Sequence, residues 1–315
     1  MTVGPDVLVR IPLADSAQAL LERDFALHHL VGSKGMDNLD PALARRIRAV
    51  ITNGTTGLRG DQMRALPGLE IVVVQGAGYE GIDLDTAKAL LLPVTTGGGT
   101  NVDTVADHAI GLMLAVARGI PFADQGMKDG DWNRGRLHRP IIFGRKLGIV
   151  GLGQIGARIA DRARGFEMEI GYHGRTRRAG VSYPFFSTPQ EIAAWADFLV
   201  LSCMGGPATT NLVDAVVLDA LGPEGFVVNI ARGSVVNLDA LLSALNEGLI
   251  AGAALDVFPD EPDPPLPEAL RRAPNLVMTP HIAGRSPQAT ATNGQRLHDN
   301  LIAHFAGRPL VARLV

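Results

Sequence analysis

The sequence has few of the features that mark exported or membrane-spanning proteins. Cys203 is the only cysteine in 315 residues, so no disulfide can form within the chain and a reducing compartment fits. Residues 1–10 lack the basic start and long apolar stretch of a signal peptide, and later apolar runs are broken by glycine, proline or charge. We therefore expect a cytoplasmic protein that does not associate with a membrane.

The chain also lacks an excess of basic charge. It carries 29 lysine and arginine residues against 32 aspartate and glutamate residues, a formal net charge of −3. Because nucleic-acid binding needs a broad basic surface, nucleic acid is not an expected partner. Hydrophobic residues make up 46% of the chain, enough for ordinary globular cores, and the length favours two domains.

Strand-like and helix-like segments alternate along the chain, which predicts an α/β fold with parallel sheets. In the first third we expect a helix at 41–48 and strands at 7–11, 49–51, 71–74 and 92–95. A long apolar helix is expected at 101–118 and a loop at 126–140. Further strands, in an order that fits a complete dinucleotide-binding domain, are expected at 147–150, 169–172, 198–201, 226–229, 252–256 and 276–278.

The last helix, expected at about 286–305, begins after the second sheet is complete, so it is free to cross back to the first. This predicts a discontinuous substrate-binding domain, 1–100 plus 285–315, around a dinucleotide-binding domain at 101–284. Both would have Rossmann-like or flavodoxin-like folds with parallel sheets, and the active site is expected in the cleft between them.

The segment 147–156, LGIVGLGQIG, combines a buried strand with the pattern G-x-G-x-x-G and leads directly into a helix. Gly151 permits the tight turn, Gly153 lets the backbone approach a pyrophosphate, and Gly156 lets helix and strand pack closely. The phosphates would lie at the helix N-terminus, at Gln154 and Ile155, where free N–H groups favour anions. An ordinary strand-to-helix turn is the alternative interpretation.

Three polar residues follow expected strands near the end of the second unit: Arg232, Glu261 and His281. Loops beyond the carboxyl ends of parallel strands are where α/β sheets form sites, so these residues can converge near a bound nicotinamide. Arginine offers a planar fork of donors for a carboxylate or a carbonyl oxygen, and histidine can donate a proton near neutral pH. A neighbouring glutamate would orient the imidazole and stabilise its protonated form.

Each of these residues also has a plain structural interpretation. Arg232 alone could be a solvated loop residue, Glu261 a surface carboxylate, and His281 a hydrogen-bonded structural histidine. Their joint occurrence after a nucleotide-binding motif favours the functional interpretation.

Together these motifs resemble the D-isomer-specific 2-hydroxyacid dehydrogenase family almost from end to end. The similar segments are GAGYEGID (76–83), VADHA (105–109), GDW (130–132), the glycine pattern, NIARG (229–233), ALDVF (254–258) with Glu261 and Pro262, and PHIAG (280–284). The subgroup that the chain resembles most is that of the glyoxylate and hydroxypyruvate reductases.

The resemblance implies that Arg232 binds the substrate's carboxylate and carbonyl, that His281 is the acid-base residue and that Glu261 is its partner. It also implies a homodimer, and no metal site is expected. The residues that the resemblance places near the dinucleotide are Thr104 and Asp256 at the nicotinamide end, together with Cys203, Ile230, His281 and Gly284.

The turn Gly76-Ala77-Gly78 follows an expected strand and can direct successive backbone N–H groups at one anion, here the substrate carboxylate. A simple strand-to-helix turn is the alternative, but the resemblance places this loop across the cleft. Relatives often carry Asn-Thr-Pro-Gly after the next strand, whereas this chain has TTGGGT at 95–100. The loop at 95–100 is therefore expected to be more mobile.

The segment 172–178, YHGRTRR, bears on the choice between NAD and NADP. An NAD enzyme usually has an acidic residue about 20 residues after the glycine pattern, on the ribose 2′-hydroxyl, and this segment has none. Arg175, Arg177 and Arg178 instead supply positive charge that suits a 2′-phosphate. An exposed basic loop is the alternative, but the missing acid and the arginines together favour NADP over NAD.

The sequence and the resemblance therefore predict NADPH-dependent reduction of a small 2-ketoacid, glyoxylate or hydroxypyruvate, to the D-2-hydroxyacid. Two alternatives stay open: a dinucleotide-sensing regulator of the same fold, and a dehydrogenase of another small anion such as phosphite.

Overall fold

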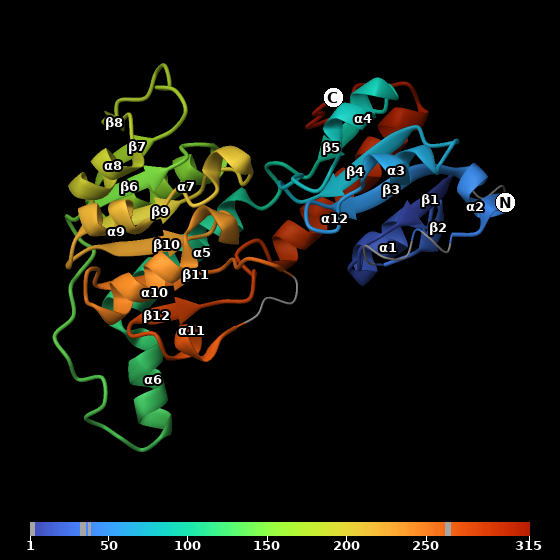
Figure 1. Ribbon diagram of the computed structural model, residues 1–315. Helices are drawn as coiled ribbons and strands as arrows, with labels where there is room; N and C mark the ends of the chain where they lie inside the picture. Colours follow the sequence, from blue (N-terminus) through green and yellow to red (C-terminus); the bar gives the residue numbers. More distant parts are fainter. Residues whose placement is uncertain (1–3, 32–35, 37–38, 262–265) are drawn as a thin grey trace. The chain divides into compact units, whose positions relative to one another are not determined.

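A computed structural model describes residues 4–31, 36, 39–261 and 266–315 (Figure 1). The chain forms two compact units, which are described separately: unit 1, Met1–Asn101 with Arg285–Val315, and unit 2, Val102–Gly284. Pro262, which belongs to the family pattern around Glu261, lies outside the described residues.

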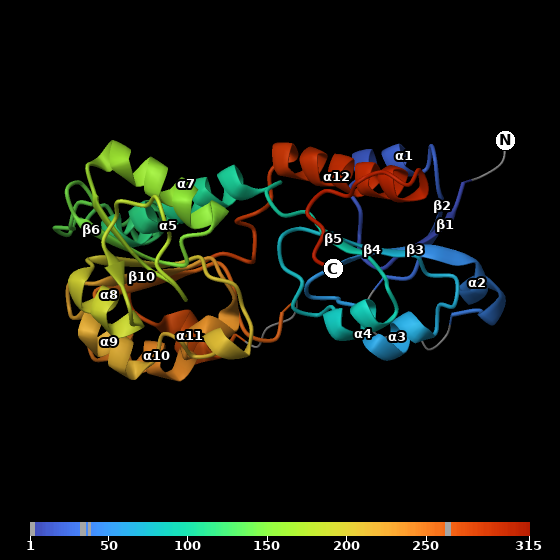
Figure 2. The same cartoon turned by 90° about the horizontal axis from the view of Figure 1, so that it is seen from above.

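Unit 1 has a five-stranded parallel sheet in the flavodoxin-like order β2-β1-β3-β4-β5. Its strands are β1 (Asp6–Val9), β2 (Ala26–His29), β3 (Ile47–Asn53), β4 (Ile71–Gln75) and β5 (Val94–Thr96). Its helices are α1 (Asp15–Leu21), α2 (Pro41–Arg46), α3 (Gly60–Arg64), α4 (Leu84–Ala89) and α12 (Pro287–Phe305). Figure 2 shows α1 and α12 on one face of this sheet and α3 and α4 on the other.

Strand β4 shows why the strands of unit 1 are continuous apolar runs. A parallel sheet covered by helices is buried on both faces, so residues that point in either direction enter a core. Val72 and Val74 belong to the core on one face. Val73 belongs to the core on the other face, together with Leu297 and Leu301 of α12.

Unit 2 has a seven-stranded parallel sheet in the order β12-β11-β10-β9-β6-β7-β8, the dinucleotide-binding order with β12 added. Its strands are β6 (Lys146–Val150), β7 (Glu169–His173), β8 (Phe185–Phe186), β9 (Phe198–Leu201), β10 (Phe226–Asn229), β11 (Gly252–Leu255) and β12 (Leu276–Met278). Its helices are α5 (Val102–Arg118), α6 (Ile120–Lys128), α7 (Gln154–Ala163), α8 (Pro189–Trp195), α9 (Ala215–Leu221), α10 (Leu238–Asn246) and α11 (Glu268–Arg272). Helices α5 and α7 cover one face, and α8, α9 and α10 cover the other (Figure 2).

The expected α/β fold with two parallel sheets is confirmed. Strands β2 and β8 and helix α6 were not expected, and α6 includes Gly126–Lys128 of the segment 126–140, which was expected to be a loop. Among the described residues, no single helix is long and apolar enough to cross a membrane. Helices α5 and α6 meet that criterion only as a pair, and they are bent by 65°.

Candidate active site

The glycine turn of unit 2 joins β6 to α7, where the strand order reverses between β6 and β9. Gly151 has a φ of +96°, and a Cβ there would lie 2.6 Å from the backbone of Cys203. A Cβ on Gly156 would lie 2.3 Å from the Gly151 carbonyl oxygen, so glycine is needed for this close packing. A Cβ on Gly153 would meet nothing within 4 Å, which leaves this backbone open to a ligand.

The N-terminus of α7 lies directly beside that open backbone. The cap residue is Gly153, and no side chain of the described residues caps the helix, so the first N–H groups, at Gln154 and Ile155, are available to an anion. Because the helix dipole also favours negative charge here, the turn fits the pyrophosphate of a dinucleotide.

The arginine loop follows β7, and its members differ in what they do. Arg178 Nη1 donates to the Leu152 carbonyl in the glycine turn, and Arg178 N donates to the Tyr172 hydroxyl at 2.8 Å. Arg178 thus holds the loop against the turn. Arg175 and Arg177 are exposed, and their positive charge would suit a 2′-phosphate.

The loops that carry Arg232, Glu261 and His281 follow β10, β11 and β12, which are neighbours in the sheet. A short hydrogen bond joins Glu261 Oε2 to His281 Nδ1, and Glu261 Oε1 accepts from the backbone N–H of Phe258 at 2.8 Å. The His281 side chain is 44% exposed, whereas that of Glu261 is 16% exposed. The glutamate therefore lies behind the histidine and leaves Nε2 of the ring accessible.

The Arg232 loop lies against the Glu261 loop. A Cβ on Gly233 would lie 2.0 Å from the carbonyl carbon of Phe258, so the two backbones are in direct contact. Asn229 shapes the turn itself, because its Oδ1 accepts from Ala231 N at 3.0 Å and its Nδ2 donates to the Arg232 carbonyl at 2.9 Å. The structure thus brings together the loops of all three residues that the sequence singled out.

Asp256 is fully buried and holds the His281 loop. Its carboxylate accepts from the Thr279 hydroxyl at 2.5 Å and from the backbone N–H groups of Ile282 and Ala283 at 2.9 Å each. Its backbone carbonyl accepts from His281 N at 2.8 Å. His281 has a φ of 51°, a conformation that costs a non-glycine residue about 1–3 kcal/mol, so these bonds are needed to maintain it.

His108 of α5 completes this network. Its Nε2 lies 3.0 Å from Thr279 Oγ1 and 3.4 Å from Asp256 Oδ1. Burial alone would raise the pKa of Asp256, but the hydrogen bonds from His108, Thr279 and the two backbone N–H groups lower it below its usual value. Thr104 lies one turn before His108 on the same side of α5.

The family resemblance implied a place for Asp256 at the nicotinamide end of the cofactor, and neither the resemblance nor the sequence pattern gave His108 or Thr279 a role. The pairing of β11 with β12 shows why Thr279 lies beside Asp256. Leu255 pairs with Met278, so the next residues of the two strands, Asp256 and Thr279, are neighbours.

The remaining residues expected near the dinucleotide also lie in unit 2. Ile230 is buried after β10, while Cys203 and Gly284 are half-buried. Burial raises the pKa of Cys203 to about 11, although a backbone hydrogen bond and the charge of Arg232 act in the opposite direction. The thiol is therefore protonated at neutral pH.

The Gly76-Ala77-Gly78 turn lies in unit 1, after β4. Gly76 N donates to Asn293 Oδ1 at 3.3 Å, and the Gly76 carbonyl accepts from Gly97 N at 2.8 Å. No acceptor within the described part of the chain takes the N–H of Ala77 or Gly78. These two groups are therefore the ones available to a carboxylate.

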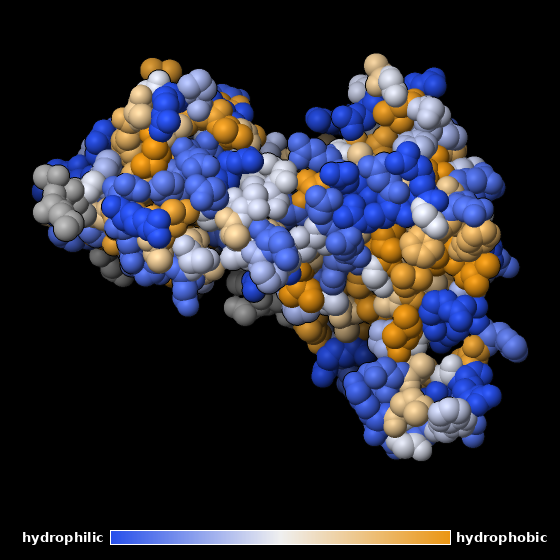
Figure 3. Space-filling view, turned by 180° about the vertical axis from the view of Figure 1, so that it is seen from behind, coloured by the Kyte–Doolittle hydropathy of each residue, from blue (hydrophilic) through white to orange (hydrophobic). Residues whose placement is uncertain are grey.

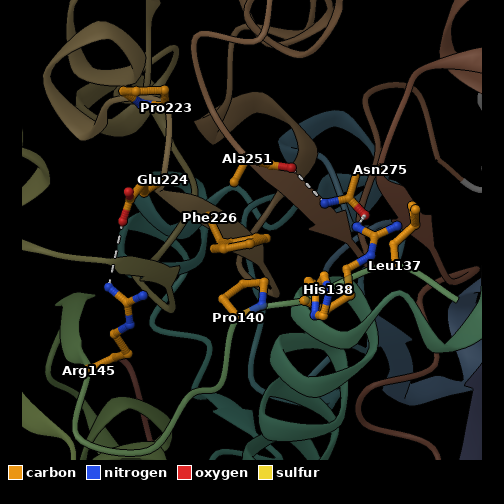
Figure 4. A pocket seen from close by; sticks show the side chains of 10 residues that line it. Leu137, His138, Pro140, Arg145, Pro223, Glu224, Phe226, Ala251 and Asn275 are labelled. Carbon is orange, nitrogen blue, oxygen red and sulfur yellow. Dashed lines mark hydrogen bonds and ion pairs between the residues drawn. The ribbon is translucent and has the colours of Figure 1, made fainter. Parts of the chain in front are cut away.

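A separate hollow in unit 2 lies at the opposite ends of the strands (Figure 4). Phe226, Ala251 and Asn275, at the starts of β10, β11 and β12, line it, and Asn275 Nδ2 donates to the Ala251 carbonyl at 2.6 Å. Since Arg232, Glu261 and His281 follow the carboxyl ends of the same strands, this hollow is not part of their site.

A dinucleotide cradle and an accessible, carboxylate-paired histidine at the carboxyl edge of one sheet place the chain among the nicotinamide-dependent dehydrogenases. Residues 110–283 match the family described as D-isomer specific 2-hydroxyacid dehydrogenase, NAD binding domain. The chain belongs to this family, which confirms the resemblance found in its motifs.

Relatives that match almost the whole length of the chain are named as reductases. A 2-ketogluconate reductase of Gluconobacter oxydans is 38% identical, with 100% of both chains covered. A glyoxylate/hydroxypyruvate reductase of Arabidopsis thaliana is 36% identical, with 98% of both covered. The solved structure of an NADPH-dependent glyoxylate/hydroxypyruvate reductase from Sinorhizobium meliloti, in complex with NADP and malonate, is 35% identical with a TM-score of 0.91, covering 99% of this chain and 97% of that one.

The Asp256 network predicts a defined pH dependence of stability. Because the pKa of Asp256 is lowered in the folded protein, its ionised carboxylate stabilises the fold at neutral pH, and this contribution is lost as the pH falls below about 4. Asp256→Asn should therefore lower stability by about 1.5–3 kcal/mol at pH 7, and this difference should shrink progressively as the pH falls below about 4. Thermal melts of both proteins from pH 3 to 8 measure this, and parallel curves would contradict it.

Proposed function

We propose that this chain reduces small 2-ketoacids, with glyoxylate and hydroxypyruvate as the candidates, to D-2-hydroxyacids with NADPH. The observation that carries the proposal is the Glu261–His281 hydrogen bond beside the Arg232 loop, at the carboxyl edge of a dinucleotide-binding sheet. The reductase activities named for the relatives support the substrate class, and the NADP of the Sinorhizobium meliloti complex supports the cofactor.

Each proposed residue has one task. When bound, NADPH supplies a hydride to C2 of the ketoacid. His281 donates a proton from Nε2 to the oxygen on C2, while Glu261 at Nδ1 stabilises the protonated ring. Arg232 binds the substrate carboxylate and also stabilises the negative charge that develops on the C2 oxygen. In the reverse oxidation, neutral His281 accepts the proton.

The two units have different proposed roles. Unit 2 is the dinucleotide-binding domain, with the pyrophosphate at Gly153 and the N-terminus of α7, and the 2′-phosphate at Arg175. Unit 1 is the substrate-binding domain, in which the N–H groups of Ala77 and Gly78 bind the carboxylate. Asp256 acts through the His281 loop, because its carboxylate is buried and fully hydrogen-bonded within the protein.

The direct test of the function is NADPH oxidation with glyoxylate, hydroxypyruvate, 2-ketogluconate, pyruvate and phenylpyruvate. We expect turnover with glyoxylate or hydroxypyruvate, and chiral chromatography should show the D-hydroxyacid as the product of hydroxypyruvate. An L product, or no turnover with any of the five, would contradict the proposal.

Arg175→Ala tests the cofactor assignment. Loss of one charge-assisted phosphate contact should raise the KM for NADPH about tenfold to a hundredfold and leave the KM for NADH nearly unchanged. Arg164→Ala is the matched control, because Arg164 is also exposed but is paired with Asp161 at 2.7 Å. A wild-type protein that prefers NADH would overturn the assignment.

His281→Ala should lower kcat by about 10²–10⁴ without weakening NADPH binding in a fluorescence titration. His29→Ala, at an exposed end of β2 in unit 1, is the control and should be active. Glu261→Gln keeps a hydrogen-bond partner for Nδ1 but removes the negative charge beside the ring, so kcat for reduction should fall, though less than in His281→Ala. A kcat equal to that of the wild type would mean that Glu261 is not the partner of His281.

We also propose a cytoplasmic homodimer. Large apolar side chains are exposed along the segment 120–143 of unit 2: Ile120, Phe122, Met127, Trp132, Leu137, Ile141 and Phe143. Figure 3 shows hydrophobic surface on this part of unit 2, and Leu137 also lines the hollow of Figure 4. A second copy that covers this surface would double the mass of 33.2 kDa, which sedimentation measures.

A further inference from the structure

Asn293 of α12 lies in a hydrogen-bond network of unit 1 that has no part in the proposed proton transfer or cofactor binding. The residue is 7% exposed. Its Oδ1 accepts from the backbone N–H of Gly76 at 3.3 Å and lies 2.8 Å from the Thr100 hydroxyl, whose single hydrogen it shares with the Gly97 carbonyl at 2.6 Å. One side-chain oxygen therefore joins α12 to the loops that follow both β4 and β5.

The absence of a side chain at Gly97 makes this contact possible. A Cβ at that position would lie 2.4 Å from Asn293 Oδ1 and 2.7 Å from Gly76 N. The 95–100 loop, which its glycines alone would leave mobile, is also held by Arg296, whose Nη1 donates to the Gly98 carbonyl at 3.3 Å. Helix α12 thus fixes both loops.

The backbone of Gly76 packs against Gly97, because a Cβ on Gly97 would lie 2.7 Å from Gly76 N. Gly76 itself has a φ of +82°, and a Cβ there would meet nothing within 4 Å, so no side chain at this position restrains the turn. Its hydrogen bonds to Asn293 and Gly97 do so instead. The Asn293 bond reaches the N–H directly before those of Ala77 and Gly78.

We propose that Asn293 is a positioning residue for substrate binding. It holds the Gly76 turn in one arrangement, so that the N–H groups of Ala77 and Gly78 are already placed for the carboxylate. This inference rests on the proposed function, because it takes the carboxylate of a 2-ketoacid as the occupant of the turn.

The same helix provides a matched control. Asn300 is 1% exposed, and its side chain also makes two hydrogen bonds, here both to backbone, with the N–H and the carbonyl of Val311 at 2.9 and 3.1 Å. These bonds hold the C-terminal segment rather than the Gly76 turn. Asn300→Ala should therefore lower stability about as much as Asn293→Ala, without an effect on the turn.

The experiment combines hydrogen exchange with kinetics on the full chain. Asn293→Ala should speed exchange in the peptide that covers 76–79 and raise the KM for the ketoacid about fivefold to tenfold, while kcat and NADPH affinity change less than twofold. Asn300→Ala should leave both readouts at their wild-type values. Thr100→Val, which removes the hydroxyl shared by Asn293 and the Gly97 carbonyl, should act in the same direction as Asn293→Ala, and Thr100→Ser should not.

The outcomes separate the two ideas. Unchanged exchange at 76–79 in both Asn293→Ala and Thr100→Val overturns the positioning role, whatever the activity. Faster exchange with an unchanged KM for the ketoacid means that the turn does not bind the carboxylate. This result also overturns the positioning role of Asn293. A wild-type protein that turns over no 2-ketoacid refutes the proposed function, while exchange still decides whether Asn293 holds the turn. If Asn293→Ala does not fold, the Thr100 pair decides.

Discussion

The position of the proposed proton donor depends on one buried carboxylate. Asp256 accepts hydrogen bonds from Thr279 and from two backbone N–H groups beyond His281, and its own carbonyl binds His281 N. These bonds compensate for the left-handed backbone of His281 and turn its ring toward Glu261. Because several neutral donors surround the carboxylate, it stays ionised despite complete burial.

In both units a buried polar side chain holds a neighbouring loop by hydrogen bonds. In unit 2 a buried aspartate after β11 holds the loop after β12, and in unit 1 a buried asparagine on α12 holds the loop after β4. In both units a glycine lets two segments pack closely. Gly233 lies against the backbone of Phe258 in unit 2, and Gly97 lies against the side chain of Asn293 in unit 1. The parallel sheets supply rigid strand ends, and single buried polar side chains then fix the loops that carry the proposed site residues.

Sequence predicted most of the fold, because long apolar runs mark strands that are buried on both faces. It missed β8, whose two residues are too short to show a period, and α6, whose Gly126 suggested a loop although Pro121 fits a helix start. Arg232, Glu261 and His281 were identifiable because each follows an expected strand. The contact of Arg178 with the glycine turn and the reach of Asn293 depend on tertiary approach between distant segments, which local pattern does not encode.

The most direct test of the account is to follow the hydrogen that is transferred. The protein is incubated with hydroxypyruvate and NADPH that carries deuterium in both positions at C4 of the nicotinamide, and the hydroxyacid is analysed by mass spectrometry. We expect one deuterium in the product, at C2, because the second new hydrogen is the proton that His281 delivers to oxygen. A reduced product without deuterium at C2 would contradict direct hydride transfer and with it the proposed roles of Arg232, Glu261 and His281.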